Sequence, residues 1–149
     1  MKLQKMMKML HPIKVDLEDN FINFRYIGSD NIIYKTKKNL FEENTGLTIL
    51  NPDIDIPAYL LELSYFGTKI ICGHIIDNSI AKLKAEGLED ILLIVDFTDV
   101  TEVSESFMEQ YVKFYLSTKS KVISINQNTN INYAFSKYIE SIIDIQEVV

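Results

Sequence analysis

The chain has 149 residues, of which 47% are hydrophobic, and its formal net charge is −6. This length fills one core and leaves room for a short appendage, which excludes two ordinary domains. The excess of acid disfavours nucleic acid as a partner, because phosphate backbones repel the molecule as a whole. A single cysteine excludes an internal disulfide, and neither a signal core nor an apolar run of membrane-spanning length occurs. We therefore expect a cytoplasmic protein without membrane insertion.

The first ten residues form a basic segment in which Leu3, Met6, Met7 and Leu10 recur at helical spacing beside three lysines. Such a segment suits a membrane surface or a groove on a partner, but a frayed start or a short packing helix is the simpler interpretation. Two apolar runs, 21–27 and 32–36, flank the turn residues 28–31 and predict a pair of strands. Polar, Gly and Pro residues then mark a boundary near Asn51 to Asp55. We expect a β-rich N-terminal extension over residues 1–53 and an α/β domain over residues 54–149.

From Ala58 onward the pattern alternates between strand and helix. Ala58 to Phe66 predicts a strand that ends at Gly67, and the apolar spacing of Ile76, Ile80 and Leu83 predicts a helix that ends at Gly87. The continuous apolar run 91–95, closed by Asp96, is typical of a central strand that helices cover on both faces.

A second helix, a second strand and a last helix follow. Phe107, Tyr111, Phe114 and Tyr115 have the spacing of a core-facing helix, and residues 121–125 predict a strand. The last helix carries an apolar stripe from Ile131 to Ile142, and residues 143–149 are predicted to add a short edge strand. The alternation predicts an α/β fold with a mixed, partly parallel sheet and helices packed on it.

Residues 94–107, Ile-Val-Asp-Phe-Thr-Asp-Val-Thr-Glu-Val-Ser-Glu-Ser-Phe, carry the clearest functional signal. This segment resembles the signature of STAS domains, the anti-sigma-factor-antagonist fold, in which a buried strand ends in Asp and serines open a helix. It is most similar to the STAS-like proteins grouped as domain of unknown function 4325. The resemblance extends in pattern from Ala58 to Ile143.

The resemblance implies a non-enzymatic regulatory module that docks to a histidine-kinase-like ATPase through the loop and helix 100–115. It implies that Ser106, and after it Ser104, are candidate phosphoacceptors at the start of that helix. Glu105 stands where the classical STAS sequence has a serine and Phe107 where it has a glycine, so a carboxylate is already built into this loop. The partner-binding residues expected from this reading are Asp99, Thr101, Glu102, Glu105, Met108 and Glu109.

Capping explains the same serines as well as regulation does. Ser106 with Glu109 forms a capping box, and Ser104 can equally serve as the N-cap with Glu105 in the first turn. Asp96 also matches the phospho-accepting Asp of a receiver domain, but the acid cluster and late lysine that a receiver needs have no convincing counterpart. An Asp that closes a strand is more often a turn residue.

The sequence supports little other chemistry, and we expect no cofactor and no metal. Cys72 and His74 lie two residues apart, and a core cysteine beside a surface histidine explains them better than a nucleophilic pair. Two histidines and one cysteine do not supply a four-ligand zinc site of N and S donors, and the five glycines form no phosphate loop. Residues 126–130 read as a loop that caps the last helix.

Two alternatives to a docking module remain at this point. One is a small-ligand-binding or catalytic α/β domain with a site at the carboxyl ends of the strands, near Asp96, Thr98 and Asn126. The other is a homo-oligomer assembled through an exposed strand edge in the N-terminal extension.

Overall fold

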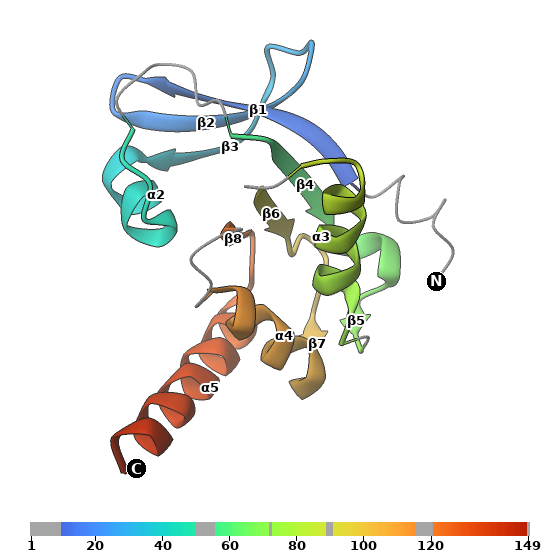
Figure 1. The fold of residues 1–149 in the computed structure, drawn as a ribbon, viewed down its shortest axis with the longest axis vertical. Helices are drawn as coiled ribbons and strands as arrows, with labels where there is room; N and C mark the ends of the chain where they lie inside the picture. The colour runs from blue at the N-terminus through green and yellow to red at the C-terminus, as the bar shows by residue number, and fades with distance from the viewer. Residues whose placement is uncertain (1–9, 50–55, 72, 89–90, 116–120, 149) are drawn as a thin grey trace.

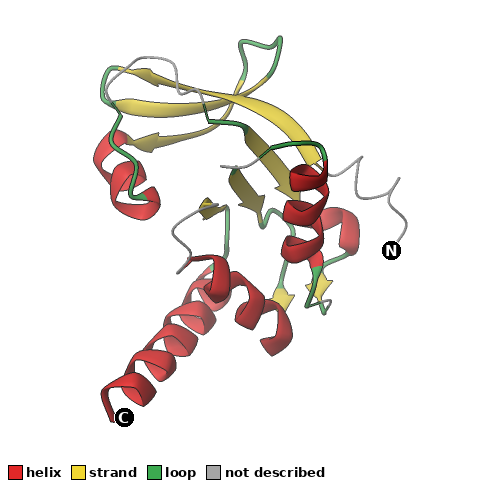
Figure 2. Cartoon of the chain, viewed as in Figure 1, coloured by secondary structure: helices red, strands yellow, loops and turns green. Residues whose placement is uncertain are grey.

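The computed structural model describes residues 10–49, 56–71, 73–88, 91–115 and 121–148, with the side chains beyond residue 141 and those of residues 114 and 115 left aside. These residues form a curled, mixed sheet of six strands with helices packed against it (Figure 1, Figure 2). The predicted α/β class with a strand-rich N-terminal region is confirmed.

The N-terminal region supplies three antiparallel strands and one helix. Strand β1 (Leu10–Glu18) pairs with β2 (Phe21–Tyr26), which pairs with β3 (Ile32–Lys37). In β1 the apolar residues Ile13 and Val15 are buried while Lys14 between them is exposed, which is the alternation of a strand with one buried face. Helix α2 (Lys38–Thr45) follows and ends at Gly46, whose φ of 71° suits a left-handed C-terminal turn.

The remaining strands of the large sheet are parallel. Strand β4 (Ala58–Glu62) pairs with β6 (Leu92–Asp96), and β6 pairs with β8 (Lys121–Ile125). The order across the sheet is β3-β2-β1-β4-β6-β8, so β6 lies between two parallel neighbours. The prediction of a partly parallel sheet is confirmed, and the run 91–95 lies in the middle of its three parallel strands. The run is not at the centre of the whole sheet, because β6 is the fifth of six strands and lies next to the edge strand β8.

Both faces of β6 are buried, but helices cover only one of them fully. Leu93 and Val95 face helices α3 (Ile75–Ala85), α4 (Glu105–Tyr115) and α5 (Thr129–Val148). Leu92 and Ile94 face a second cluster that strands β1 and β2 and helix α2 supply. The expectation of helices on both faces is therefore only half right: the sheet curls, so its own N-terminal strands cover the other face (Figure 1).

The strand predicted from Ala58 to Phe66 is too long. Strand β4 ends at Glu62, opposite Asp96 at the end of β6, and the chain turns into a 3-10 helix, η1 (Leu63–Phe66). The ladder between β4 and β6 ends at this pair, so on that side a longer β4 would leave its backbone groups unpaired. Two short strands, β5 (Lys69–Ile70) and β7 (Glu102–Val103), form a separate parallel pair that the pattern did not predict.

The short edge strand predicted for residues 143–149 is wrong, because helix α5 continues to Val148. No glycine or proline follows Gly87 in the chain, so nothing in the sequence ends this helix early. Among the helices that the structure describes, none has both the length and the apolar character needed to cross a membrane.

The N-terminal strands and the later strands belong to one sheet. β1 pairs antiparallel with β4, from Leu10 opposite Leu61 to Ile13 opposite Ala58. The predicted boundary at residues 51–55 and the predicted helical segment up to residue 9 lie outside the described residues. Leu10, the last residue of that segment, is buried as the first residue of β1.

Candidate functional site

The candidate site is the N-terminus of α4, which the end of β6 and the short β5–β7 pair hold in place. After Asp96 the chain turns through Asp99, whose φ is 64°, and enters β7. The backbone N–H of Thr101 and the hydroxyl of Thr101 both donate to the carbonyl of Thr68, at 2.8 and 3.1 Å. The loop is therefore fastened to the segment that precedes α3.

Ser104 is the N-cap of α4. Its Oγ accepts the backbone N–H of Phe107 at 3.1 Å and donates to the carbonyl of Ile71 at 2.9 Å, and its own N–H donates to the carbonyl of Ile70 at 2.8 Å. Glu105 follows in the first turn, where a carboxylate interacts favourably with the helix dipole. Of the two capping arrangements that the sequence left open, the structure contains the one centred on Ser104.

Ser106 lies inside the first turn and is exposed, in contact with the turn before α3. A Cβ built on Gly73 would lie 1.9 Å from Ser106 Oγ and 3.1 Å from Ser106 Cβ. Only a residue without a side chain allows this approach of the two segments. Any group added to Ser106 therefore has to move away from, or displace, the backbone at Gly73.

The predicted partner-binding residues lie on one loop and one helix face. Asp99, Thr101, Glu102, Glu105 and Glu109 are exposed, whereas Met108 is partly buried against the core. Glu105 and Glu109 are four residues apart and therefore share a face of α4. Burial raises the pKa of Tyr138 on α5, and the nearby charges of Glu109 and Glu105 raise that pKa further.

Helix α4 also caps helix α3. Gln110 is 5% exposed, and its Oε1 accepts the backbone N–H groups of Ile76 at 3.0 Å and Asp77 at 3.3 Å. His74, at the N-cap position of α3, makes no side-chain capping hydrogen bond. The amide of Gln110 therefore does for α3, across the interface, what an N-cap side chain normally does within a helix.

A second polar cluster lies at the carboxyl ends of the parallel strands and includes the residues of the predicted ligand site. Asp96 Oδ1 accepts hydrogen bonds from the N–H of Thr98 (3.0 Å), the hydroxyl of Thr98 (2.7 Å) and the amide of Asn126 (3.2 Å). The structure thus brings the three residues together. Three donors already converge on one oxygen, which is how an Asp stabilises a turn after a strand.

Glu62, opposite Asp96 in the sheet, accepts from the Tyr26 hydroxyl at 3.1 Å, and His11 Nε2 lies 3.4 Å from the same carboxylate oxygen. Burial raises the pKa of Tyr26, and the hydrogen bond and negative charge of Glu62 and the charge of Asp96 raise that pKa further. This group joins the start of β1 and the end of β2 to the end of β4. Within the described residues, no three His, Cys, Asp or Glu side chains are arranged to hold a metal ion.

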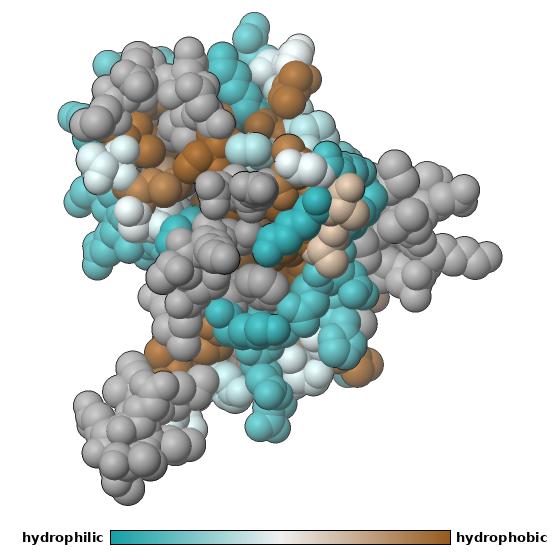
Figure 3. Space-filling view, viewed as in Figure 1, coloured by the Kyte–Doolittle hydropathy of each residue, from teal (hydrophilic) through white to brown (hydrophobic). Residues whose placement is uncertain are grey.

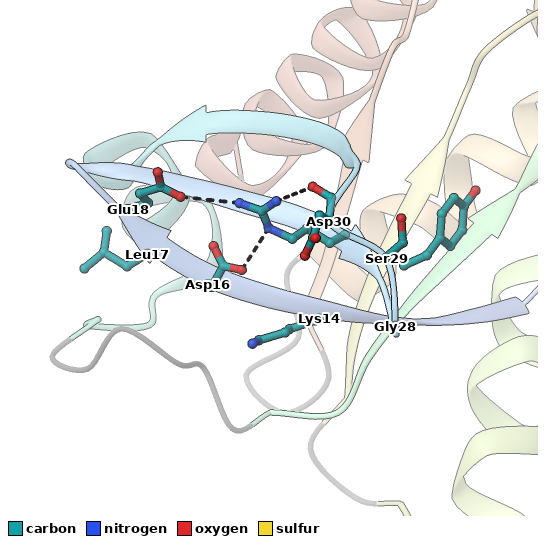
Figure 4. Close-up of a pocket in the computed structure, with 9 residues that line it drawn as sticks. Lys14, Asp16, Leu17, Glu18, Gly28, Ser29 and Asp30 are labelled. Atoms are coloured by element: carbon teal, nitrogen blue, oxygen red, sulfur yellow. Dashed lines mark hydrogen bonds and ion pairs between the residues drawn. The ribbon is translucent and has the colours of Figure 1, made fainter.

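An open groove of about 700 Å³ lies on the outer face of the β1–β2 hairpin (Figure 4). Arg25 lies across it, with Nε 3.1 Å from Asp16 Oδ2, Nη2 3.4 Å from Glu18 Oε2, and Nη1 donating to the carbonyl of Asp30. Asn23 donates to the same two carboxylates. Arg25 thus bridges two carboxylates of β1 and fastens the turn after β2 to that strand.

Two minor expectations can also be compared with the structure. Residues 126–130 were predicted to cap the last helix, and Asn128 Oδ1 accepts the N–H of Ile131 at 2.8 Å, which confirms it. The His74 side chain is 77% exposed and lies 3.7 Å from Asp77. Cys72 lies outside the described residues, so its predicted core position stays a prediction.

Three residues that matter to this site were not found from the sequence. Ile71 and Gly73 lie in a segment without a periodic pattern, and only the β5–β7 pairing brings them to Ser104 and Ser106. Gln110 did leave a signal, because it is a polar residue between Phe107 and Tyr111 on the apolar stripe of α4. A polar residue on such a stripe needs a buried partner.

Comparison with protein-family models, with curated proteins and with solved structures found no match for this chain.

Proposed function

We propose that this protein is a non-enzymatic regulatory module that binds another protein through the loop and helix 100–115. The observation that carries the proposal is the double use of Ser104, which caps α4 and bonds to the carbonyl of Ile71. These bonds hold the first turn of the helix in one position at the surface. A binding surface that is already ordered loses less conformational entropy on association.

Charge supports the same surface. Glu102, Glu105 and Glu109 are exposed on one loop and one helix face, and within the described part of the chain neither Glu105 nor Glu109 forms an ion pair. Complementary charge on a partner would accelerate association and exclude wrong partners. The Asp96 cluster, in contrast, directs its hydrogen bonds inward at its own turn. The docking surface is therefore a better candidate than the strand ends.

Ser106 is the better of the two candidate phosphoacceptors. The hydroxyl of Ser104 is committed as donor to Ile71 and as acceptor for Phe107, whereas Ser106 is exposed in the first turn. A phosphate at a helix N-terminus interacts favourably with the helix dipole, yet it adds almost two negative charges to a docking surface. Modification of Ser106 would also press on the backbone at Gly73, which links it to the start of α3.

In this proposal the partner is a histidine-kinase-like ATPase, which is the partner class that the resemblance of residues 94–107 to the STAS signature implies. The proposal also keeps the cytoplasmic location expected from the composition of the sequence. The order of elements agrees with this resemblance, since a strand ending in Asp96 is followed by a Ser-bearing helix, a parallel strand and a last helix.

The test is co-purification of the tagged full-length chain from its native cells, with the recovered proteins and any phosphoserine identified by mass spectrometry. We expect the wild-type chain to recover a kinase-like ATPase and Glu105→Arg to lose it, because reversal of one central charge creates repulsion in a complementary interface. Ser106→Asp should lose it as well. Glu86→Arg serves as the matched control, since Glu86 is an exposed acid at the opposite end of α3.

Folding must be separated from binding in this experiment. Ser106→Asn has the shape of Ser106→Asp without its charge, so it reports the steric effect at Gly73 alone. All variants should melt within a few degrees of the wild-type protein. Full recovery of the ATPase by both Glu105→Arg and Ser106→Asp would refute the docking surface.

The N-terminal region keeps a second candidate function, assembly of a homo-oligomer. Strand β3 lies at the edge of the six-stranded sheet, and Ile32 at its start is 46% exposed. Against this, Lys35 and Lys37 are exposed on the same strand, and edge lysines oppose pairing with another strand. Light scattering of the full-length chain over a hundredfold concentration range decides between a monomer and an oligomer.

A further inference from the structure

Ile71 is the most exposed of the large hydrophobic side chains that the structure describes, with 74% of its surface accessible. It lies directly after β5, beside the N-terminus of α4. Figure 3 shows hydrophobic atoms beside polar ones at the lower right of the view, where Figure 1 draws β5. A single exposed isoleucine needs no explanation in general, so its surroundings decide whether it means anything.

The backbone at Ile71 is held by the segment that joins β7 to α4. Ile70 pairs with Val103 in the β5–β7 ladder, and the carbonyls of Ile70 and Ile71 accept the N–H and the hydroxyl of Ser104, at 2.8 and 2.9 Å. The residue that caps α4 therefore also presents Ile71 at the surface. An exposed apolar side chain on an ordered backbone is the arrangement of an interface anchor, which fills a pocket on the partner at low entropic cost.

Exposed carboxylates lie on the two elements that contact the Ile71 segment, β7 and α4. Glu102 is 67% exposed on the strand that pairs with β5, and Glu105 and Glu109 are exposed on α4. Two cations lie in the same region and are paired: Lys69 lies 3.8 Å from Glu102, and Lys113 of α4 lies 4.0 Å from Asp77 of α3. An apolar centre with a charged rim is the usual anatomy of a protein-binding patch.

We infer that Ile71 is the apolar anchor of the docking surface, and that the partner offers an apolar pocket bordered by lysine or arginine side chains. This inference rests on the proposed function and names the chemistry of its partner. The acidic rim disfavours anionic lipid as the ligand. It also disfavours a second copy of this chain, because a symmetric interface would place the same carboxylates opposite one another.

Photo-crosslinking tests the surface directly. Benzoylphenylalanine is placed at position 71 of the full-length chain, and at position 27 as a control, because Ile27 is 66% exposed on the hairpin turn. We expect an adduct from position 71 alone, attached to a peptide in which apolar residues adjoin lysine or arginine. Absence of an adduct at 71, equal adducts at both positions, an acidic target peptide or an adduct to a second copy would overturn the inference.

The affinity of the purified partner for variants of the chain then tests the role of Ile71. Ile71→Asp should weaken binding by about 30-fold or more, as loss of a central hot-spot residue does. Ile71→Leu and Ile27→Asp should stay within a few-fold of wild type. If Ile71→Asp binds normally while Glu105→Arg does not, the anchor is refuted and the docking function stands. If both bind normally, both proposals fail.

Discussion

At the scale of single residues, Ser104 and Ser106 look equivalent in the sequence and differ completely in their surroundings. Ser104 has both hydrogen-bonding roles of its hydroxyl occupied, one within α4 and one toward Ile71. Ser106 lies two residues further along the chain, where it is exposed to solvent and contacts Gly73. Ser104 therefore holds the helix N-terminus in place, whereas Ser106 is the exposed candidate for modification.

Removal of the two hydroxyls should separate these roles. Ser104→Ala is expected to lower the free energy of unfolding by about 1 kcal/mol, because the N–H of Phe107 and the carbonyl of Ile71 lose their partner. Ser106→Ala should change it by less than about 0.5 kcal/mol. Urea unfolding followed by circular dichroism measures both. Equal effects of the two substitutions would contradict the assignment of Ser104 as the N-cap.

The Tyr26 hydroxyl provides a pH-dependent prediction. Burial and the carboxylates of Glu62 and Asp96 hold its folded-state pKa above the ordinary value of about 10. The folded protein therefore keeps this proton after the unfolded chain has lost it. The protonated Tyr26 hydroxyl contributes its full stabilisation to the folded state below a pH of about 10. This stabilisation is lost as the pH rises through the raised pKa that Tyr26 has in the folded protein.

The absorbance of ionised tyrosine at alkaline pH checks this. The difference between the wild-type titration and that of Tyr26→Phe isolates Tyr26, and its midpoint should lie above 10. Glu62→Gln should bring the midpoint down, because it removes the negative charge and the charged acceptor. A midpoint at or below 10 in the folded wild-type protein would show that Tyr26 is not in this environment.

At the scale of elements, α3 and α4 are held together by a polar contact inside an apolar interface. Gln110 is buried and accepts two backbone N–H groups of the first turn of α3. Buried donors that lose their acceptor retain their full desolvation cost. The start of α3, which includes the turn at Gly73, therefore depends on α4.

Gln110→Met keeps the length of the side chain and removes the acceptor. We expect it to lower the free energy of unfolding by about 1–3 kcal/mol and to speed hydrogen exchange at the amides of Ile76 and Asp77. Glu109→Met, on the exposed face of the same helix, should stay within about 0.5 kcal/mol of wild type. Unchanged exchange at Ile76 in Gln110→Met would mean that the amide does not cap α3 in solution.

At the scale of the whole molecule, the N-terminal strands complete the core of the α/β part. Ile13, Val15, Ile22 and Phe24 pack on the face of the sheet that carries Leu60, Leu92 and Ile94. Phe41 of α2 adds to this cluster, with its ring centroid 6.0 Å from that of Phe24. One face of the parallel strands is therefore covered by residues that precede the predicted boundary.

A chain of residues 54–149 should consequently fail to fold into a stable unit. It lacks β1, the antiparallel neighbour of β4, and it exposes a contiguous apolar face, which favours aggregation. We expect a poorly dispersed NMR spectrum and no cooperative thermal transition, whereas residues 10–149 should unfold cooperatively. A well-dispersed spectrum and a cooperative transition for residues 54–149 would establish that part as an independent domain.

The sequence by itself determined the elements whose signal is local. The apolar run of β6, the stripes of α3, α4 and α5, and the β2–β3 hairpin follow from spacing and turn residues, and each is present. It also determined that Asp96 closes a strand and that serines open a helix. Strand β1 was not predicted, although Ile13, Val15 and Leu17 alternate with charged residues in the pattern of a half-buried strand.

Only the tertiary structure decided how distant segments meet. The end of β4, the β5–β7 pair and the curl of the sheet depend on which strands become neighbours, and no local pattern contains that choice. The same holds for the site. Ser104 could be distinguished from Ser106 only once Ile71 and Gly73 had been brought beside them. Hydrogen bonds and close contacts between residues more than thirty positions apart form when the core closes, so a pattern read along the chain cannot supply them.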